Sequence, residues 1–201
     1  MIFFFDLDGV IIKSLDIKNQ IYIKLYKKKN IFIKKILYKN DKILRGLSRK
    51  KKISSINKLI KLRMNNNETQ NLIEEFSKIY SSKLKNIRLF DYYLSFLKKI
   101  YKTKNIYCVS SSPEIEVKKI LHLKKINKYF DLIKGAPTTK YVNIKKILRL
   151  NYINKNQAIY IGDTKKDYIA ARKNEIDFCF FGNPKPQWVR DKMHIKSWKD
   201  F

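Results

Sequence analysis

The chain has 201 residues, of which 44% are hydrophobic and 13% aromatic. This length and apolar content suffice for a buried core and argue against a disordered chain. No apolar run reaches the roughly 20 residues that a membrane-spanning helix needs. Asp6 and Asp8 interrupt the N-terminal apolar stretch before it could serve as a signal peptide. Cys108 and Cys179 lie in apolar runs, so we expect two buried free thiols and a cytoplasmic protein without a membrane partner.

The formal charge of +29 at pH 7 raises the question of a nucleic-acid partner. Only seven of the 46 basic residues are Arg, the residue that makes most bidentate contacts to bases. Lysines are spread along the whole chain together with Asn and Ile, a bias that A- and T-rich codons explain. The composition therefore argues against a dedicated nucleic-acid interface and favours attraction of small anionic substrates.

The first predicted element is a short buried strand at Ile2–Phe5, followed at once by Asp6-Leu7-Asp8-Gly9-Val10. From Leu15 to Leu89, apolar residues recur at intervals of three and four, which is typical of helices. We expect breaks between these helices near Lys29–Asn30, Arg45–Gly46 and Asn65–Asn67.

From Phe90 onward, short apolar strands alternate with helices, which predicts βαβ units and a parallel sheet covered by helices. The predicted strands of this part are Asn105–Val109, Phe130–Ile133, Ala158–Ile161 and Phe178–Phe181. The N-terminal strand must join them in one sheet. We therefore expect an α/β core made of residues 1–14 and 89–201, interrupted by a helical insertion of residues 15–88.

Polar side chains follow several of the predicted strands. Because ligands bind at the carboxyl ends of strands in open α/β sheets, Asp6 and Asp8 are candidate site residues. Ser110 and Ser111 follow the second strand, with Pro113 at a predicted helix start. Hydroxyls and free backbone N–H groups there form an anion site, although a serine-rich helix cap is the plainer alternative.

Two further segments complete the set. Lys140 ends a loop before a predicted helix at Val142–Leu150, and Gly162-Asp163 with Asp167 follows the strand at Ala158–Ile161. An N-cap aspartate with an ordinary acid in the first helical turn is the alternative for the latter. Asp and Glu together number only 17, yet two aspartates follow each of two strands. Carboxylates and backbone carbonyls suit Mg²⁺, and a serine and a lysine beside that cation would bind a phosphate.

These segments resemble, in order and spacing, the four motifs of the haloacid dehalogenase superfamily. The likeness is to its phosphatase branch, which includes phosphoglycolate phosphatase and β-phosphoglucomutase, and it covers essentially the whole chain. The residues that carry it are Asp6-Leu7-Asp8-Gly9-Val10, Ser110, Lys140 and Gly162-Asp163 with Asp167. The resemblance implies an α/β fold, a Rossmann-like parallel-sheet core with an inserted α-helical cap.

The resemblance also implies a role for each residue. Asp6 would be the nucleophile, and Asp8 would be the general acid and then the general base. Asp6, the backbone carbonyl of Asp8 and Asp163 would bind Mg²⁺. The phosphoryl oxygens would be held by Ser110, Ser111 and Lys140, and the site would be supported by Asp167, Gly9 and Gly162. An acid at Asp8 favours phosphate esters over halides, because an alkoxide leaving group needs a proton.

Lys134 competes with Lys140 for the anchoring role, since the Lys-Pro pair common in relatives is absent. We favour Lys140 because it directly precedes the predicted helix, where the family places its lysine. In the cap, Arg45 or Arg49 of the Gly-broken loop Leu44–Arg49 would grip an anionic group of the substrate. The alternative is that both are solvated arginines beside a helix cap.

We therefore expect a Mg²⁺-dependent phosphatase that acts on a small phosphorylated metabolite of the sugar phosphate or phosphoglycolate type, as a monomer or homodimer. A phosphomutase of the β-phosphoglucomutase type would use the same aspartyl-phosphate, so it remains the alternative enzyme. A phosphate- or nucleic-acid-binding protein is the non-enzymatic alternative. Asp6 and Asp8 argue against it, because binding alone requires neither a nucleophile nor an adjacent acid.

Overall fold

The computed structural model describes residues 1–189 and 193–200, which form two compact units. One unit combines Met1–Lys13 with Arg88–Phe201, and we refer to it as the core. The other, Ser14–Ile87, is continuous in sequence, and we refer to it as the cap. Among the described helices, none combines the length and the apolar run that crossing a membrane requires.

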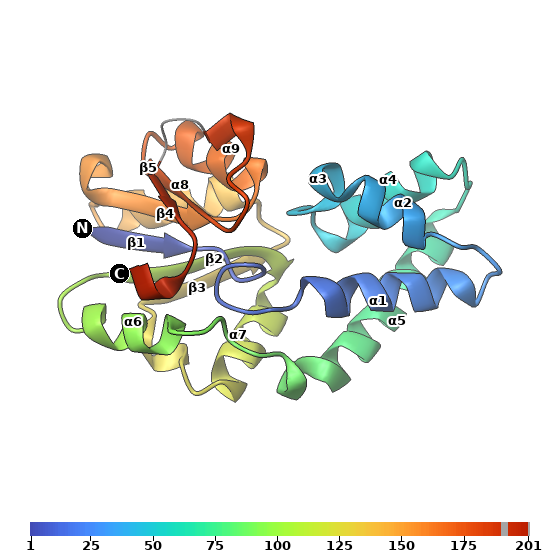
Figure 1. Cartoon of the computed structure of the whole chain (residues 1–201), viewed down its shortest axis with the longest axis horizontal. Coiled ribbons are helices and arrows are strands. Elements are labelled where there is room, and N and C mark those ends of the chain that lie inside the picture. Colours follow the sequence, from blue (N-terminus) through green and yellow to red (C-terminus); the bar gives the residue numbers. More distant parts are fainter. Residues whose placement is uncertain (190–192, 201) are drawn as a thin grey trace. The chain divides into compact units, whose positions relative to one another are not determined.

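The core contains a six-stranded parallel sheet in the order β3-β2-β1-β4-β5-β6 (Figure 1). Its strands are β1 (Ile2–Phe5), β2 (Ile106–Pro113), β3 (Leu132–Ala136), β4 (Ala158–Gly162), β5 (Asp177–Phe181) and β6 (Met193–Ile195). Because β1 lies between β2 and β4, the carboxyl ends of these three strands meet at the centre of one edge of the sheet. The strand order reverses there, which is where open α/β sheets bind their ligands.

Helices cover both faces of this sheet (Figure 1). The core helices are α6 (Tyr93–Ile100), α7 (Glu114–Leu123), α8 (Lys140–Leu150) and α9 (Lys165–Lys173), with short 3₁₀ turns η2 (Asn127–Tyr129), η3 (Lys155–Gln157), η4 (Gln187–Val189) and η5 (Trp198–Asp200). Successive side chains of a strand point to opposite faces. Phe4 accordingly packs on Tyr107 in the layer of α8 and α9, whereas Phe3 and Phe5 contact Phe96 of α6. The predicted Rossmann-like α/β core is confirmed.

Apart from shifts of one residue at strand ends, the strands of the core differ from the prediction in three places. β2 continues through the serines to Pro113, which pairs with Ala136 after a shift of register. β3 begins two residues later than expected, because Phe130 follows the turn η2 and Asp131 uses its carboxylate to accept a hydrogen bond from the Ile106 N–H over 2.7 Å. β6 was not predicted, since three residues are too short to show an alternating pattern.

The cap is helical, as predicted. Its elements are α1 (Leu15–Lys27), α2 (Lys34–Lys39), α3 (Asp41–Leu44), α4 (Arg49–Leu59), α5 (Asn66–Lys83) and η1 (Leu84–Asn86). The three predicted breaks are confirmed: the chain leaves α1 before residue 29, turns at Gly46, and enters α5 through a capping box between Asn65 and Glu68. Tyr22 of α1 packs on Phe76 of α5, with ring centroids 4.5 Å apart, which joins the two longest cap helices.

The two thiols also agree with the prediction. Cys108 on β2 and Cys179 on β5 are both free and fully buried among apolar side chains. Burial disfavours the thiolate and raises the pKa of both groups, Cys179 to about 12, so they behave as small core residues.

Candidate active site

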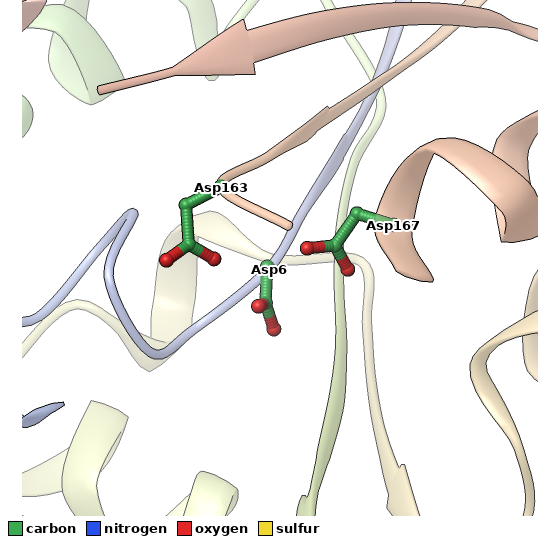
Figure 2. Close-up of side chains that lie close together, drawn as sticks. All are labelled: Asp6, Asp163 and Asp167. Carbon is green, nitrogen blue, oxygen red and sulfur yellow. The ribbon is translucent and has the colours of Figure 1, made fainter. Parts of the chain in front are cut away.

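Three carboxylates converge at the carboxyl edge of the sheet (Figure 2). Asp6 directly follows β1, Asp163 directly follows β4, and Asp167 lies in the first turn of α9. One carboxylate oxygen from each lies within 4.8 Å of the others. The Asp6 N–H donates to the Ile161 carbonyl over 3.0 Å, which carries the pairing of β1 and β4 up to the site itself. Such closely spaced acids repel one another unless cations lie between them.

One such cation is the ammonium group of Lys140, at the start of α8. Its Nζ lies 2.8 Å from Asp6 Oδ1 and 2.5 Å from Asp167 Oδ1, and the side chain is almost fully buried. Lys134, the rival candidate, lies on β3 instead, with Nζ 3.9 Å from Glu114 Oε1 and a side chain 39% exposed. The structure thus brings Lys140 to the acids and leaves Lys134 outside the cluster.

Burial dominates the electrostatics of this cluster. It raises the pKa of Asp6 to about 7, with Asp167 and Asp8 adding to the effect and Lys140 opposing it. Burial also disfavours the charged amine of Lys140, but Asp167 and Asp6 outweigh it and raise the pKa of that group. One ammonium group therefore serves two buried carboxylates, and the site retains an excess of negative charge.

Asp167 connects the cluster to the backbone of α9. Its Oδ2 accepts hydrogen bonds from the Thr164 N–H at 3.0 Å and the Thr164 hydroxyl at 2.6 Å. The Asp167 N–H in turn donates to the Thr164 hydroxyl oxygen at 3.3 Å, which completes a capping box. Since its Oδ1 contacts Lys140, both oxygens of Asp167 are engaged. Gly162 makes this packing feasible, because a Cβ at that position would lie 2.4 Å from Asp167 Cβ. The helix cap and the charged site are thus served by one side chain.

The hydroxyl group of Ser112, which was not predicted as a site residue, contacts the loop after β1. Ser112 donates its hydroxyl proton to Asp8 Oδ2 over 2.8 Å, and its N–H donates to Ser110 Oγ over 3.1 Å. The position of Ser112, two residues after Ser110 in the same serine run, could have indicated it. Ser110 is fully buried and Ser111 is partly exposed between them. The loop turns at Gly9, whose φ of 85° lies in the region that favours glycine.

The two cap arginines have partners inside the cap. Arg45 forms an ion pair with Asp41, one turn away, at 2.7 Å. The Arg49 guanidinium lies 4.4 Å from the centre of the Phe76 ring and donates a hydrogen bond to the Ser77 hydroxyl. Arg49 therefore connects α4 to α5 within the cap.

The donor set of the cluster suits a hard cation. Mg²⁺ binds oxygen ligands and usually takes one or two carboxylates while keeping several waters. Asp6 and Asp163 supply two carboxylates, whereas Asp167 is engaged by Lys140 and Thr164. Lys140 neutralises only part of the negative charge of the cluster, so a bound divalent cation would neutralise the rest. The residues present therefore fit a magnesium ion.

Comparisons with known proteins show the family and the fold of the chain. The family model of haloacid dehalogenase-like hydrolases matches residues 3–181. A solved structure described as β-phosphoglucomutase from Clostridium difficile has a TM-score of 0.85 at 21% identity, covering 100% of this chain and 93% of that one. A predicted phosphoglycolate phosphatase from Haemophilus somnus has a TM-score of 0.83 at 17% identity, covering 99% and 95%. A predicted phosphatase from Clostridium acetobutylicum has a TM-score of 0.82 at 20% identity, covering 98% and 94%. No curated protein sequence matches the chain.

Proposed function

The chain belongs to the haloacid dehalogenase-like hydrolase family, and from this premise we propose that it is a Mg²⁺-dependent phosphatase of small phosphorylated metabolites. The observation that carries the proposal is the pairing of Asp6 with Lys140 at 2.8 Å inside a cluster of acids. A buried carboxylate beside a fixed ammonium group can attack phosphorus while that ammonium group attracts the phosphoryl oxygens. A site used only for binding anions would gain nothing from a carboxylate in that place.

The first half of the reaction uses both aspartates of the loop after β1. An oxygen of Asp6 forms a bond to phosphorus, and the bond from phosphorus to the ester oxygen breaks. Asp8 gives its proton to the departing oxygen, which leaves as an alcohol. The hydrogen bond from Ser112 orients Asp8 for this transfer, and Ser110, Ser111 and Lys140 hold the phosphoryl oxygens.

The second half returns the enzyme to its starting state. Asp8, now ionised, takes a proton from a water molecule whose oxygen attacks phosphorus. The bond between phosphorus and Asp6 breaks, inorganic phosphate leaves, and Asp8 is again protonated. Asp6, Asp163 and the backbone carbonyl of Asp8 would hold Mg²⁺, which neutralises charge on the phosphoryl group when bound. Asp167 keeps Lys140 in place throughout.

Substrate choice would depend on the cap. We place Arg45 or Arg49 against the part of the substrate that does not react, where a guanidinium group binds a second anionic group. A phosphorylated hydroxy acid carries a carboxylate for such a contact, whereas a sugar monophosphate would offer hydroxyl groups to the same guanidinium group. The scarcity of arginine in this lysine-rich chain makes these two residues the natural candidates.

The experiment is a screen of phosphorylated metabolites in the presence of Mg²⁺, with released phosphate and isomerised product measured together. We expect phosphate release from at least one small sugar or hydroxy-acid phosphate, and no release by Asp6→Asn. Isomerised product without phosphate release would indicate a phosphomutase instead. Turnover by Asp6→Asn above about a tenth of the wild-type rate would exclude Asp6 as nucleophile, because loss of a nucleophile costs several orders of magnitude.

A further inference from the structure

Trp198, in the turn η5 of the core, makes a hydrogen bond to the loop that carries Asp6 and Asp8. Its Nε1–H donates to the Val10 carbonyl over 3.0 Å, and the side chain is only 2% exposed. These two residues are 188 positions apart in the sequence. Trp198 also lies outside residues 3–181, the part of the chain that the family model matches.

The indole ring of Trp198 lies at the centre of an aromatic cluster. It stacks on Phe96 and on Phe181, with ring centroids 4.9 Å and 4.8 Å away. It meets Tyr93 at 5.0 Å and Phe5 at 5.7 Å in edge contacts. This cluster fixes the indole, so its N–H is presented in one direction.

Trp198 therefore contacts the chain on both sides of the two aspartates. Phe5 directly precedes Asp6, and Val10 directly follows Gly9. Between them the chain folds tightly, since the N–H groups of Ile11 and Ile12 both donate to the Leu7 carbonyl at 3.0 Å. A displacement of Val10 would also displace Asp8, because these hydrogen bonds hold the short loop between them in one conformation.

We propose that Trp198 is a positioning residue for Asp6 and Asp8, acting through its hydrogen bond to Val10 and its contact with Phe5. The inference rests on the proposed function for its effect on catalysis, but the placement of the loop can be measured without any substrate. Val10 is fully buried, so without the indole N–H its carbonyl would lose a hydrogen-bond donor that water cannot easily replace. A small displacement of a reacting group is enough to slow a reaction severely.

The test compares two variants of the same aromatic cluster. Trp198→Phe keeps a ring but removes the N–H donor, whereas Phe181→Leu removes a stacked ring that makes no hydrogen bond to the loop. Both should lower the melting temperature, so each is compared with the wild type well below its own transition. Hydrogen exchange of the amides of residues 7–12 is measured first, and kcat and KM with a hydrolysed phosphate ester second.

We expect Trp198→Phe to speed exchange in residues 7–12 and to lower kcat about tenfold with little change in KM. Phe181→Leu should leave both quantities within about twofold of the wild type, because the N–H donor is kept and Phe96, Tyr93 and Phe5 still hold the indole. Equal behaviour of the two variants in exchange and in kcat would overturn the proposal and make Trp198 a core residue only. If the wild type hydrolyses no phosphate ester, the proposed function fails, and the exchange result alone decides whether Trp198 positions the loop.

Discussion

Ser112 donates a hydrogen bond to Asp8 over 2.8 Å, and this contact joins the end of β2 to the loop that follows β1. A general acid needs a fixed direction toward the oxygen that it protonates. Removing the hydroxyl in Ser112→Ala should lower kcat roughly tenfold to a hundredfold, while Ser112→Thr, which keeps a hydroxyl, should retain most of the activity. Steady-state kinetics of the two variants check this. Equal activity of Ser112→Ala and the wild type would show that Asp8 needs no such support.

Lys140 and Lys134 offer a matched pair of lysines for stability. Replacing Lys140 by Ala leaves two buried carboxylates without their shared cation, which should cost about 3–5 kcal/mol of unfolding free energy and abolish turnover. Replacing Lys134 should cost less than about 1 kcal/mol, because its side chain is 39% exposed and its Nζ lies as far as 3.9 Å from the Glu114 carboxylate. Urea denaturation without added metal measures both. Similar losses would contradict the central place given to Lys140.

Metal removal is the next test. A chelator should stop hydrolysis and Mg²⁺ should restore it, because the acid cluster and a phosphate dianion would otherwise repel one another. Mg²⁺ should also raise the melting temperature of the wild type by binding the folded state, and should have little effect on Asp163→Asn. Asp177→Asn, which changes an exposed acid of the same core, is the control and should keep the response. Chelator-resistant activity that ignores added Mg²⁺ would give these acids another role.

The main features of the site could be predicted from the sequence because they follow strand ends. Asp6, Ser110 and Asp163 come directly after apolar runs or lie at their ends, and strands pair in parallel so that those ends meet. Lys140 was preferred to Lys134 because it precedes a predicted helix, the place where the resemblance to the family puts the lysine. These are local patterns, and local patterns survive in the fold.

The contacts that could not be predicted join residues far apart in sequence. Ser112 and Asp8 are 104 positions apart, and Trp198 and Val10 are 188 apart. Neither pair produces a periodic pattern, since each depends on how β2 or η5 packs against the first loop. Asp167 was expected to support the site. Its ion pair with Lys140 could not be predicted, because it requires α8 and α9 to pack side by side, and neither helix sequence alone shows that packing.

The cap arginines give a prediction about specificity. Arg45→Ala should lower kcat/KM for the metabolite by an amount that corresponds to about 1.5–3 kcal/mol of activation free energy, the loss of one charge-assisted contact. It should barely change the hydrolysis of a small aryl phosphate. Lys42→Ala changes an exposed lysine of α3, the helix whose C-cap is Arg45, and is the control. Arg49→Ala should in addition reduce stability, since it loses the Phe76 ring and the Ser77 hydroxyl. Equal losses on both substrates would mean that the loop supports the fold or the chemistry.

The most direct test of the account is to trap the covalent intermediate. The enzyme is mixed with substrate and Mg²⁺, quenched in acid, and treated with borohydride, which reduces an acyl phosphate of aspartate to homoserine. Peptide mass spectrometry then locates the reduced residue. The account predicts homoserine at position 6, dependent on substrate and absent from Asp6→Asn. Reduction at another residue would contradict nucleophilic attack by Asp6. So would the absence of a trapped species in an enzyme that shows a pre-steady-state burst of product.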